Sequence, residues 1–440
     1  MITPLLRRTA IAALFALAIL PVAHGGGQAR PATASAEEPQ TAANTEAPPK
    51  PKLLRAAELA MFEVQDVLES SPHIGRNLDR LVGFQFTPAT ARLLEAAIGS
   101  AQPMQLERLG KRDGQDAWRL MMPARQHAPG DGSSVGWSES PTELRVDKSG
   151  RRLISTGTWE RFDMQDEGMR IALRDMRTST DQRMGQGKLW FGTLQFGVKH
   201  MEFDLQAPGQ QGQPLTLMMD GLDFSGRTIE HATTFDIVHR TRIASIGVAG
   251  EQLSNLIMNY RLNQVDKKTA IEIAARSRKT ALQESGNDEK AELLAMLRDL
   301  ARASNKAGTA LTIERISADY GGHTFTLQGR LALKGAKESD FDDLAQLFKR
   351  FDATYDIAVP VALIKAGALS ASKRRMAAAG STAQDPVLMA QTMTDAVVGK
   401  LLGEGFAKLD KGVLRATITA RGGKVRVNGK EVSLPTPPQQ

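Results

Sequence analysis

Apolar and polar residues alternate in short runs along most of this 440-residue chain, and this pattern constrains its fold more than any other feature. Gly, Pro, Asn and Asp separate the runs, which lie at residues 201–205, 241–248, 256–262, 325–333, 351–359 and 414–420. A period of two is typical of strands that bury one face and expose the other to water. The sequence therefore predicts an α+β, β-rich fold with an extended antiparallel sheet or sheets.

A hairpin signal closes this β-rich part of the chain. Asn428 and Gly429 follow Val425 and Val427, and Val432 comes shortly after them. Asn-Gly between alternating apolar residues favours a two-residue turn, because both residues tolerate a positive φ. The β-rich body is expected to cover residues 102–435, and residues 436–440 are expected to form a tail.

Helical spacing is confined to a few segments. Residues 53–101 carry apolar residues at this spacing and predict a helical region ahead of the β-rich body. Residues 268–281 and 288–303, joined by the Glu-Ser-Gly-Asn stretch 284–287, predict a helix-loop-helix insertion at about 266–304.

Further helices are expected near the C-terminus. One should begin after Ser339 and another should cover residues 389–402, whereas residues 370–385 fit either a helix or a loop.

The N-terminus has the organisation of an export signal. Arg7 and Arg8 precede an uncharged apolar stretch at 9–23, and Ala23, His24 and Gly25 form a small-x-small cleavage site. The stretch is shorter than the roughly 20 residues of a spanning helix, so cleavage of residues 1–25 is favoured over a retained anchor. Residues 26–52 hold no large apolar residue and predict a disordered Pro/Ala-rich linker. We therefore expect a periplasmic or otherwise exported protein, either soluble or anchored by its N-terminal segment.

Composition excludes several classes of site. With no cysteine, the chain has no disulfides, no Cys-based metal centre and no thiol nucleophile. The formal charge of +7 is small for this length and aromatic residues are sparse, which argues against nucleic acid as a partner.

The string Gly132-Ser133-Ser134-Val135-Gly136 matches the G-x-S-x-G pattern of serine hydrolases. In those enzymes the serine lies on a sharp turn between a buried strand and a helix. Neither element is predicted around Ser134, so a flexible turn is the favoured interpretation.

Other polar residues are weighed in the same way. His231 and His239 lie eight residues apart, which on alternating strands would put both on one face, although a solvated or core-edge role is favoured for them. Asp220, Asp223, Glu230 and Asp236 include spacings open to a carboxylate pair, although surface positions on strands fit them better. Asp340, Asp342 and Asp343 match part of a calcium loop, although a capped helix start fits them better. No residue is assigned a catalytic, cofactor-binding or metal-binding role, and no cofactor is expected.

Lys373, Arg374 and Arg375 form the clearest basic cluster. Such a cluster fits either a solvated helix face or a contact with anionic lipid headgroups.

The C-terminal run from Gly423 to Leu434, GKVRVNGKEVSL, resembles the closing signature of the YdgA-like family of bacterial envelope proteins, a domain-of-unknown-function family. The upstream order, with Ile243 to Gly247, then the helical pair, then Val359-Pro360, is also similar, and the resemblance spans roughly residues 180–435. The family's aromatic-Ser pair near the N-terminus is not visible, which leaves residues 53–170 outside the resemblance. The resemblance implies an extended sheet, no established catalytic residues, and a kinship with AsmA-like proteins that would mean a role connected with lipid or the outer membrane.

Two hypotheses for the function follow. The first is a non-catalytic exported envelope protein that binds lipid or a partner protein on an apolar sheet face or groove, near the inner or outer membrane surface. The second is an exported serine hydrolase that uses Ser134.

Overall fold

The computed structural model describes residues 52–432 except 131, 167, 206–214, 249–250, 283–288 and 380–384. The predicted export signal, nearly all of the linker, the C-terminal tail and the loop between the two inserted helices therefore lie outside the described residues.

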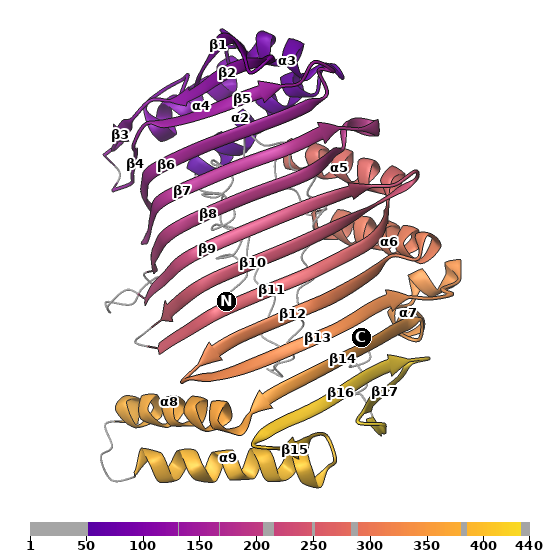
Figure 1. The fold of residues 1–440 in the computed structure, drawn as a ribbon. Helices are drawn as coiled ribbons and strands as arrows, with labels where there is room; N and C mark the ends of the chain where they lie inside the picture. Colours follow the sequence, from indigo (N-terminus) through magenta and orange to yellow (C-terminus); the bar gives the residue numbers. More distant parts are fainter. Residues whose placement is uncertain are drawn as a thin grey trace, which may run out of the picture.

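One antiparallel sheet contains all 18 strands of the described residues (Figure 1). They are β1 Gln105–Arg112, β2 Gln115–Met122, β3 Arg125–His127, β4 Ser134–Trp137, β5 Ser140–Val146, β6 Arg152–Asp166, β7 Met169–Met184, β8 Trp190–Leu205, β9 Leu215–Glu230, β10 Thr234–Val248, β11 Glu251–Asp266, β12 Ala310–Tyr320, β13 His323–Leu333, β14 Phe351–Pro360, β15 Lys408–Asp410, β16 Val413–Arg421, β17 Lys424–Val427 and β18 Lys430–Val432. The predicted extended antiparallel sheet is confirmed.

The sheet is a meander in which neighbours in sequence are neighbours in space. From β5 to β14 each strand pairs with the next, and β16, β17 and β18 continue the sheet beyond β14. At the N-terminal end of the sheet, β2 pairs with both β1 and β5. The short strand β4 pairs with β6, the same strand that pairs with β5. Between β17 and β18, Asn428 and Gly429 adopt φ angles of 51° and 86°, which confirms the predicted hairpin.

Eight helices accompany the sheet in the described part of the chain, together with two short 3₁₀ turns. The helices are α2 Lys52–Leu68, α3 Ile74–Leu81, α4 Pro88–Ile98, α5 Lys267–Leu282, α6 Glu289–Ala307, α7 Leu344–Phe348, α8 Val361–Ala379 and α9 Pro386–Gly403. The turns are η1 Gln186–Lys188 and η2 Glu338–Asp342. The predicted helices are confirmed, and α8 shows that residues 370–379, left open by the sequence, are helical. Within the described ranges, every helix falls short of the length or apolarity needed to span a bilayer.

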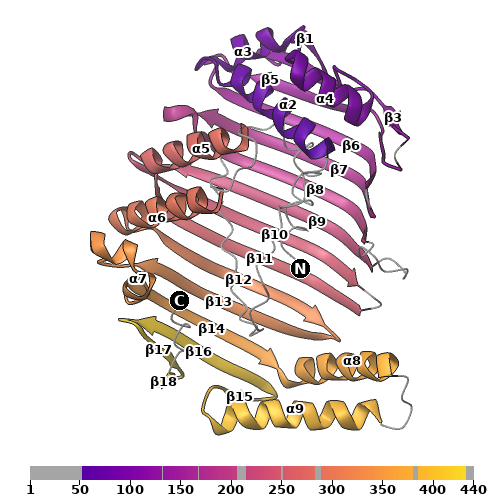
Figure 2. The same cartoon turned by 180° about the vertical axis from the view of Figure 1, so that it is seen from behind.

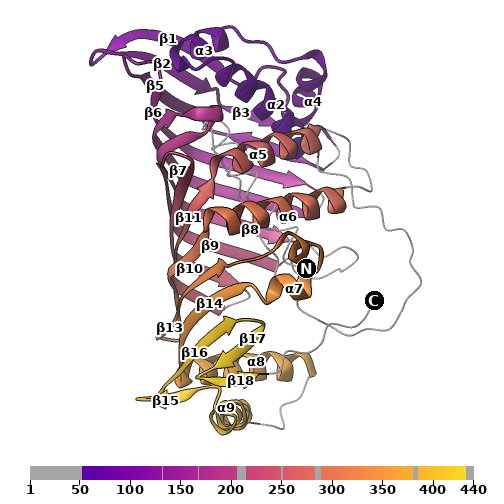
Figure 3. The same ribbon diagram turned by 90° about the vertical axis from the view of Figure 1, so that its right-hand side faces the viewer.

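All of these helices lie on one side of the sheet, as the edge-on view shows (Figure 3). Where α2, α3 and α4 cover it, this helix-side face is a dry core in which side chains such as Trp118, Leu144 and Ile171 pack against Ile74 and Leu94. A sheet needs a second layer to bury its apolar face, and these three helices provide that layer over the N-terminal strands.

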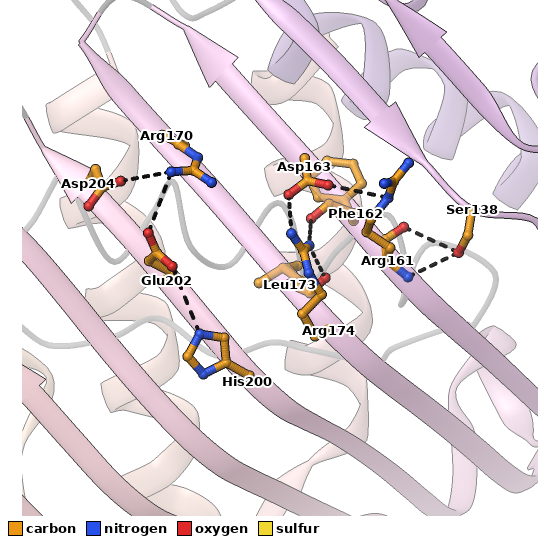
Figure 4. Close-up of polar contacts among 10 residues, drawn as sticks. All are labelled: Ser138, Arg161, Phe162, Asp163, Arg170, Leu173, Arg174, His200, Glu202 and Asp204. Carbon is orange, nitrogen blue, oxygen red and sulfur yellow. Dashed lines mark hydrogen bonds and ion pairs between the residues drawn. The ribbon is translucent and has the colours of Figure 1, made fainter.

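The opposite, outer face carries polar side chains that pair across strands (Figure 4). Arg174 Nη2 lies 2.6 Å from Asp163 Oδ1, and Arg170 Nη1 lies 3.6 Å from carboxylate oxygens of both Glu202 and Asp204. Cross-strand pairs of opposite charge at exposed positions each contribute well under about 1 kcal/mol, so this face is adapted to water more than to a partner layer.

A line of irregular positions crosses six consecutive strands. One residue in each strand is left out of the pairing register, namely Glu160, Asp175, Lys199, Gly221, Ala244 and Asn255. In every second strand that residue has a positive φ: 51° at Asp175, 61° at Gly221 and 49° at Asn255. Successive side chains of a strand normally lie on opposite faces. Because each of these strands has one unpaired residue at the same level, the apolar side chains on both sides of that level lie on the helix-side face and not on the face toward solvent.

Lys267 attaches the helical insertion to the sheet. Lys267 is the first residue of α5, and its side chain is only 8% exposed. Its Nζ lies 3.0 Å from Glu230 Oε1 and donates to the carbonyl oxygens of His231 and Ala232. Its ammonium group also lies 5.5 Å from the centre of the Phe191 ring. The turn between β9 and β10 is thereby fixed to the first residue of the insertion.

We expect Lys267→Ala to lower the free energy of unfolding by about 3 kcal/mol or more, because it leaves Glu230 and two carbonyl groups without their buried donor. The neighbouring Lys268, whose side chain is 85% exposed, provides the matched control, and Lys268→Ala should change stability by less than about 0.5 kcal/mol. Urea unfolding followed by circular dichroism measures both. Equal effects of the two substitutions would contradict the assigned role of Lys267.

Candidate functional site

The helix-side face of β9 to β16 is apolar and only half-buried, in contrast to the dry core over the N-terminal strands. We call this surface the open apolar face. Its side chains, each of intermediate exposure, are Leu217, Met219, Leu222, Phe224, Ile237, Ile246, Val248, Leu253, Leu256, Met258, Tyr260, Leu262, Leu311, Ile313, Ile316, Phe325, Leu327, Leu331, Phe351, Tyr355, Ile357, Val359 and Ile418. The pairing register makes this face continuous from strand to strand, as in the row Leu222, Ile243 and Leu256, in which the middle residue Ile243 is buried.

Helices border the open apolar face without crossing its centre (Figure 2). On one edge α5 and α6 cover the strand ends, where Ile271 and Ala270 pack on a small cluster around Phe235 and Val265. On the other edge α8 lies by the ends of β13 and β14, and α9 packs against α8. None of the described helices lies over the middle of β9 to β12, so the described residues provide no second layer there.

Three aromatic rings lie side by side on the open apolar face, and two of them form a stack. His239 on β10 lies parallel to Tyr260 on β11, with ring centres 4.7 Å apart, whereas Phe224 on β9, at 5.3 Å on the other side of His239, is tilted by 59°. Burial lowers the pKa of the His239 imidazole and raises the pKa of the Tyr260 phenol, because it disfavours the charged form of each group. Both groups are therefore neutral at pH 7, as an apolar surface requires.

A polar cluster fixes α8 at the border of the face. Glu251, the first residue of β11, accepts hydrogen bonds from Ser370 on α8 and from the Tyr320 hydroxyl at the end of β12. These two hydrogen bonds, with a smaller effect of the positive charges on Arg374 and Lys373, hold the pKa of Glu251 below its usual range. The basic cluster predicted from the sequence therefore lies near this edge of the open apolar face, and Lys373, Arg374 and Arg375 are all exposed.

Ser134 does not lie on a strand-to-helix turn. It begins β4, opposite Gln165 of β6, and Val135 and Gly136 continue the strand. The prediction of a flexible turn was correct only for the start of the string, where Gly132 has a φ of 87°, because the sequence around Val135 was too short to indicate a strand.

The two histidines do not share a face of one strand. His231 lies in the turn between β9 and β10, with Nε2 3.4 Å from Asp236 Oδ2, whereas His239 lies on the open apolar face. The shared face does not form because His231 lies in a turn that the alternation does not reveal. The favoured solvated or core-edge role fits the exposed His231 and the half-buried His239.

The four carboxylates are each engaged by a different partner. Asp220 accepts from His200 Nδ1 at 2.7 Å and from Ser245 Oγ at 2.9 Å. Asp223 pairs with Arg177, Glu230 with Arg183 and Lys267, and Asp236 with His231. These are separate hydrogen bonds and ion pairs, and no two of the four carboxylates share one of these partners.

Asp343 caps α7 by accepting from the backbone N–H of Ala345 at 2.8 Å, as a capped helix start predicts. Asp340 instead accepts from the Lys337 N–H at 2.7 Å and pairs with Arg350 at 2.8 Å, which together hold the pKa of Asp340 below its usual range. Among the described residues, no group of three or more His, Asp or Glu side chains is arranged to hold a metal ion.

Sequence patterns missed the residues that organise this region. Lys267 and Glu251 look like ordinary charged residues at the ends of a strand, and only the fold brings them to their partners. The alternation did indicate Tyr260 and Met258 as members of one strand face, but not that the face stays half-exposed.

We expect His239 to make stability fall with acidity. Because its pKa is lower in the folded state than the ordinary value of 6.5, its contribution is complete above about pH 6.5 and is lost as the pH falls from there toward the folded-state pKa. His239→Phe keeps a ring in the stack and removes the titration, so its stability relative to the wild type should rise on acidification over this range. Urea unfolding between pH 7.5 and 5 measures the difference, with His73→Phe at an exposed position as the control. A difference that does not change with pH would contradict the assignment.

Comparison with known proteins identifies the family of this chain. The family model of a bacterial protein of unknown function, DUF945, matches residues 82–435, and a search of curated proteins found no match. The match is consistent with the YdgA-like resemblance of the C-terminal part, and it begins at residue 82 rather than near residue 180. It therefore includes α4 and the N-terminal strands, which the resemblance left out. Since the match covers most of the chain, this protein belongs to the DUF945 family of bacterial proteins of unknown function.

Proposed function

We propose that this protein is a non-catalytic, exported envelope protein that binds the acyl chains of a lipid on its open apolar face. The observation that carries this proposal is the contrast along one sheet: the helix-side face is dry under α2 to α4 and half-exposed from β9 to β16. Extended apolar surfaces of this kind mark binding sites in soluble proteins.

The chemistry of the face fits hydrocarbon. Its backbone groups are paired within the sheet, so a ligand finds few hydrogen-bonding groups to satisfy and gains mainly from burial. Covering the remaining exposed area of many Leu, Ile, Met and Phe side chains is worth on the order of 10 kcal/mol in total. Adjacent strands lie about 4.8 Å apart, so the face from β9 to β14 spans at least 20 Å, which is comparable to an extended acyl chain.

Export is supported by the sequence alone. Arg7 and Arg8, the apolar stretch that follows and the small-residue site at Gly25 are the parts that export machinery reads. Envelope lipids would then be available to the open apolar face.

Leu256 and Ile257 allow a matched test of lipid binding. They are consecutive residues of β11 with opposite orientations: Leu256 lies on the open apolar face beside Ile243, and Ile257 lies on the outer face beside Arg242. Burying an unpaired amide against hydrocarbon is costly, so Leu256→Asn should reduce bound lipid by roughly tenfold, whereas Ile257→Asn should leave it unchanged. Native mass spectrometry of gently purified protein measures the lipid-to-protein ratio.

Repeated absence of copurified lipid from the wild type, together with no binding of an added fluorescent fatty acid, would overturn the proposal. A protein partner that crosslinks to the wild type and is lost only in Leu256→Asn would replace lipid as the ligand of this face.

The non-catalytic part of the proposal has its own test at Ser134. Because Ser134 begins a strand rather than a strand-to-helix turn, we expect no esterase activity above background, and no change with Ser134→Ala. Hydrolysis of short-chain nitrophenyl esters measures both rates. A wild-type rate that Ser134→Ala abolishes would establish the hydrolase hypothesis instead.

A further inference from the structure

The α8–α9 hairpin carries exposed apolar side chains near the start of α9. We call the described residues at this end of the hairpin, Lys373, Arg374 and Arg375 on α8 with Val387 and Leu388 on α9, its tip. Leu388 and Val387, in the first turn of α9, are 66% and 52% exposed, and Leu388 is the most exposed large apolar side chain of the described residues. Met393 and Val397, further along the helix, are 43% and 46% exposed. Side chains of this kind usually contact a partner or a lipid surface when they cluster on a projecting element.

The basic cluster lies at the same end of the hairpin. Ser372 Oγ on α8 lies 3.8 Å from Met393 Sδ on α9, and the two helices run antiparallel. Residues that follow Ser372, beginning with Lys373 to Arg375, therefore lie alongside residues that precede Met393, including Leu388. The single acidic residue beside Val387, Asp385, is engaged as the helix cap and accepts from the Val387 N–H at 2.8 Å.

We propose that the tip of the α8–α9 hairpin docks onto an anionic lipid bilayer. Leu388 and Val387 enter the interface while Lys373, Arg374 and Arg375 meet the headgroups. Apolar insertion and basic attraction are the two signals whose combination gives stable binding at a membrane surface. Residues 361–403 contain five basic and two acidic residues, which favours an anionic surface over an acid-rich or neutral one.

The position of the hairpin is fixed by the sheet. Ser370 donates to Glu251 at the border of the open apolar face, so a docked tip would hold this edge of the face close to the bilayer. This inference rests on the hairpin and not on lipid bound to the face, so the two proposals can fail separately.

The absence of cysteine permits a local test in the full-length protein. Leu388→Cys is labelled with an environment-sensitive nitrobenzoxadiazole dye, and Glu107→Cys on β1, at the opposite end of the sheet, is the control position. With excess vesicles of phosphatidylcholine containing 30% phosphatidylglycerol, the emission at position 388 should shift to the blue, and the emission at position 107 should not. Because both labels report only their own surroundings, binding of the N-terminal segment to vesicles does not produce this difference.

Charge is tested with two matched triple variants. Lys373→Gln with Arg374→Gln and Arg375→Gln should lower the ratio of inserted to free dye at position 388 more than tenfold, at about 1 kcal/mol for each basic residue. Arg108→Gln with Lys111→Gln and Arg112→Gln removes the same charge from exposed positions of β1 and should leave the ratio unchanged.

Three results would overturn the proposal: no shift at position 388, an equal shift at position 107, or equal losses in the two triple variants. A blue shift that rises with protein concentration in the absence of vesicles would identify a second copy of the chain as the partner and would overturn it as well.

Discussion

The structure depends on one requirement: an antiparallel sheet with an apolar face must cover that face. Helices α2 to α4 meet the requirement over the N-terminal strands, where Trp118 and Ile171 are fully buried. From β9 onward the described helices move to the two edges, and side chains such as Leu256 and Leu327 stay half-exposed. The proposal that the sheet binds lipid follows from this difference in cover between two halves of one continuous sheet.

The polar outer face explains why a ligand is expected to bind on the helix side of the sheet. Ion pairs such as Arg174 with Asp163 and hydrogen bonds such as His200 with Asp220 fill the outer face with groups that water already solvates well. A ligand would lose these interactions on binding there. The same strand thus presents hydrocarbon to one side and paired charges to the other, which directs association to a single surface.

Sequence patterns predicted the fold class, the inserted helical pair and the Asn428–Gly429 hairpin, because each depends on local periodicity or local backbone preference. They could not place partners that are distant in sequence, such as Glu251 and Ser370, which the chain brings together across 119 positions. They also could not show the line of irregular positions. At Asn255 the alternation skips one residue, so Leu253 and Leu256 share a face although their spacing is odd. The half-exposure of the apolar face also could not be predicted, because periodicity indicates which side chains share a face but not what covers that face.

The meander has a consequence for how proteins of this architecture can vary in size. Each long strand depends on its two sequence neighbours, so the stability of the sheet is close to a sum of local hairpin terms. Adding or deleting one hairpin of two strands would preserve the direction of every remaining strand and the orientation of every remaining side chain. The length of the open apolar face is therefore a quantity that evolution can adjust in steps of about 10 Å without redesigning either end of the molecule.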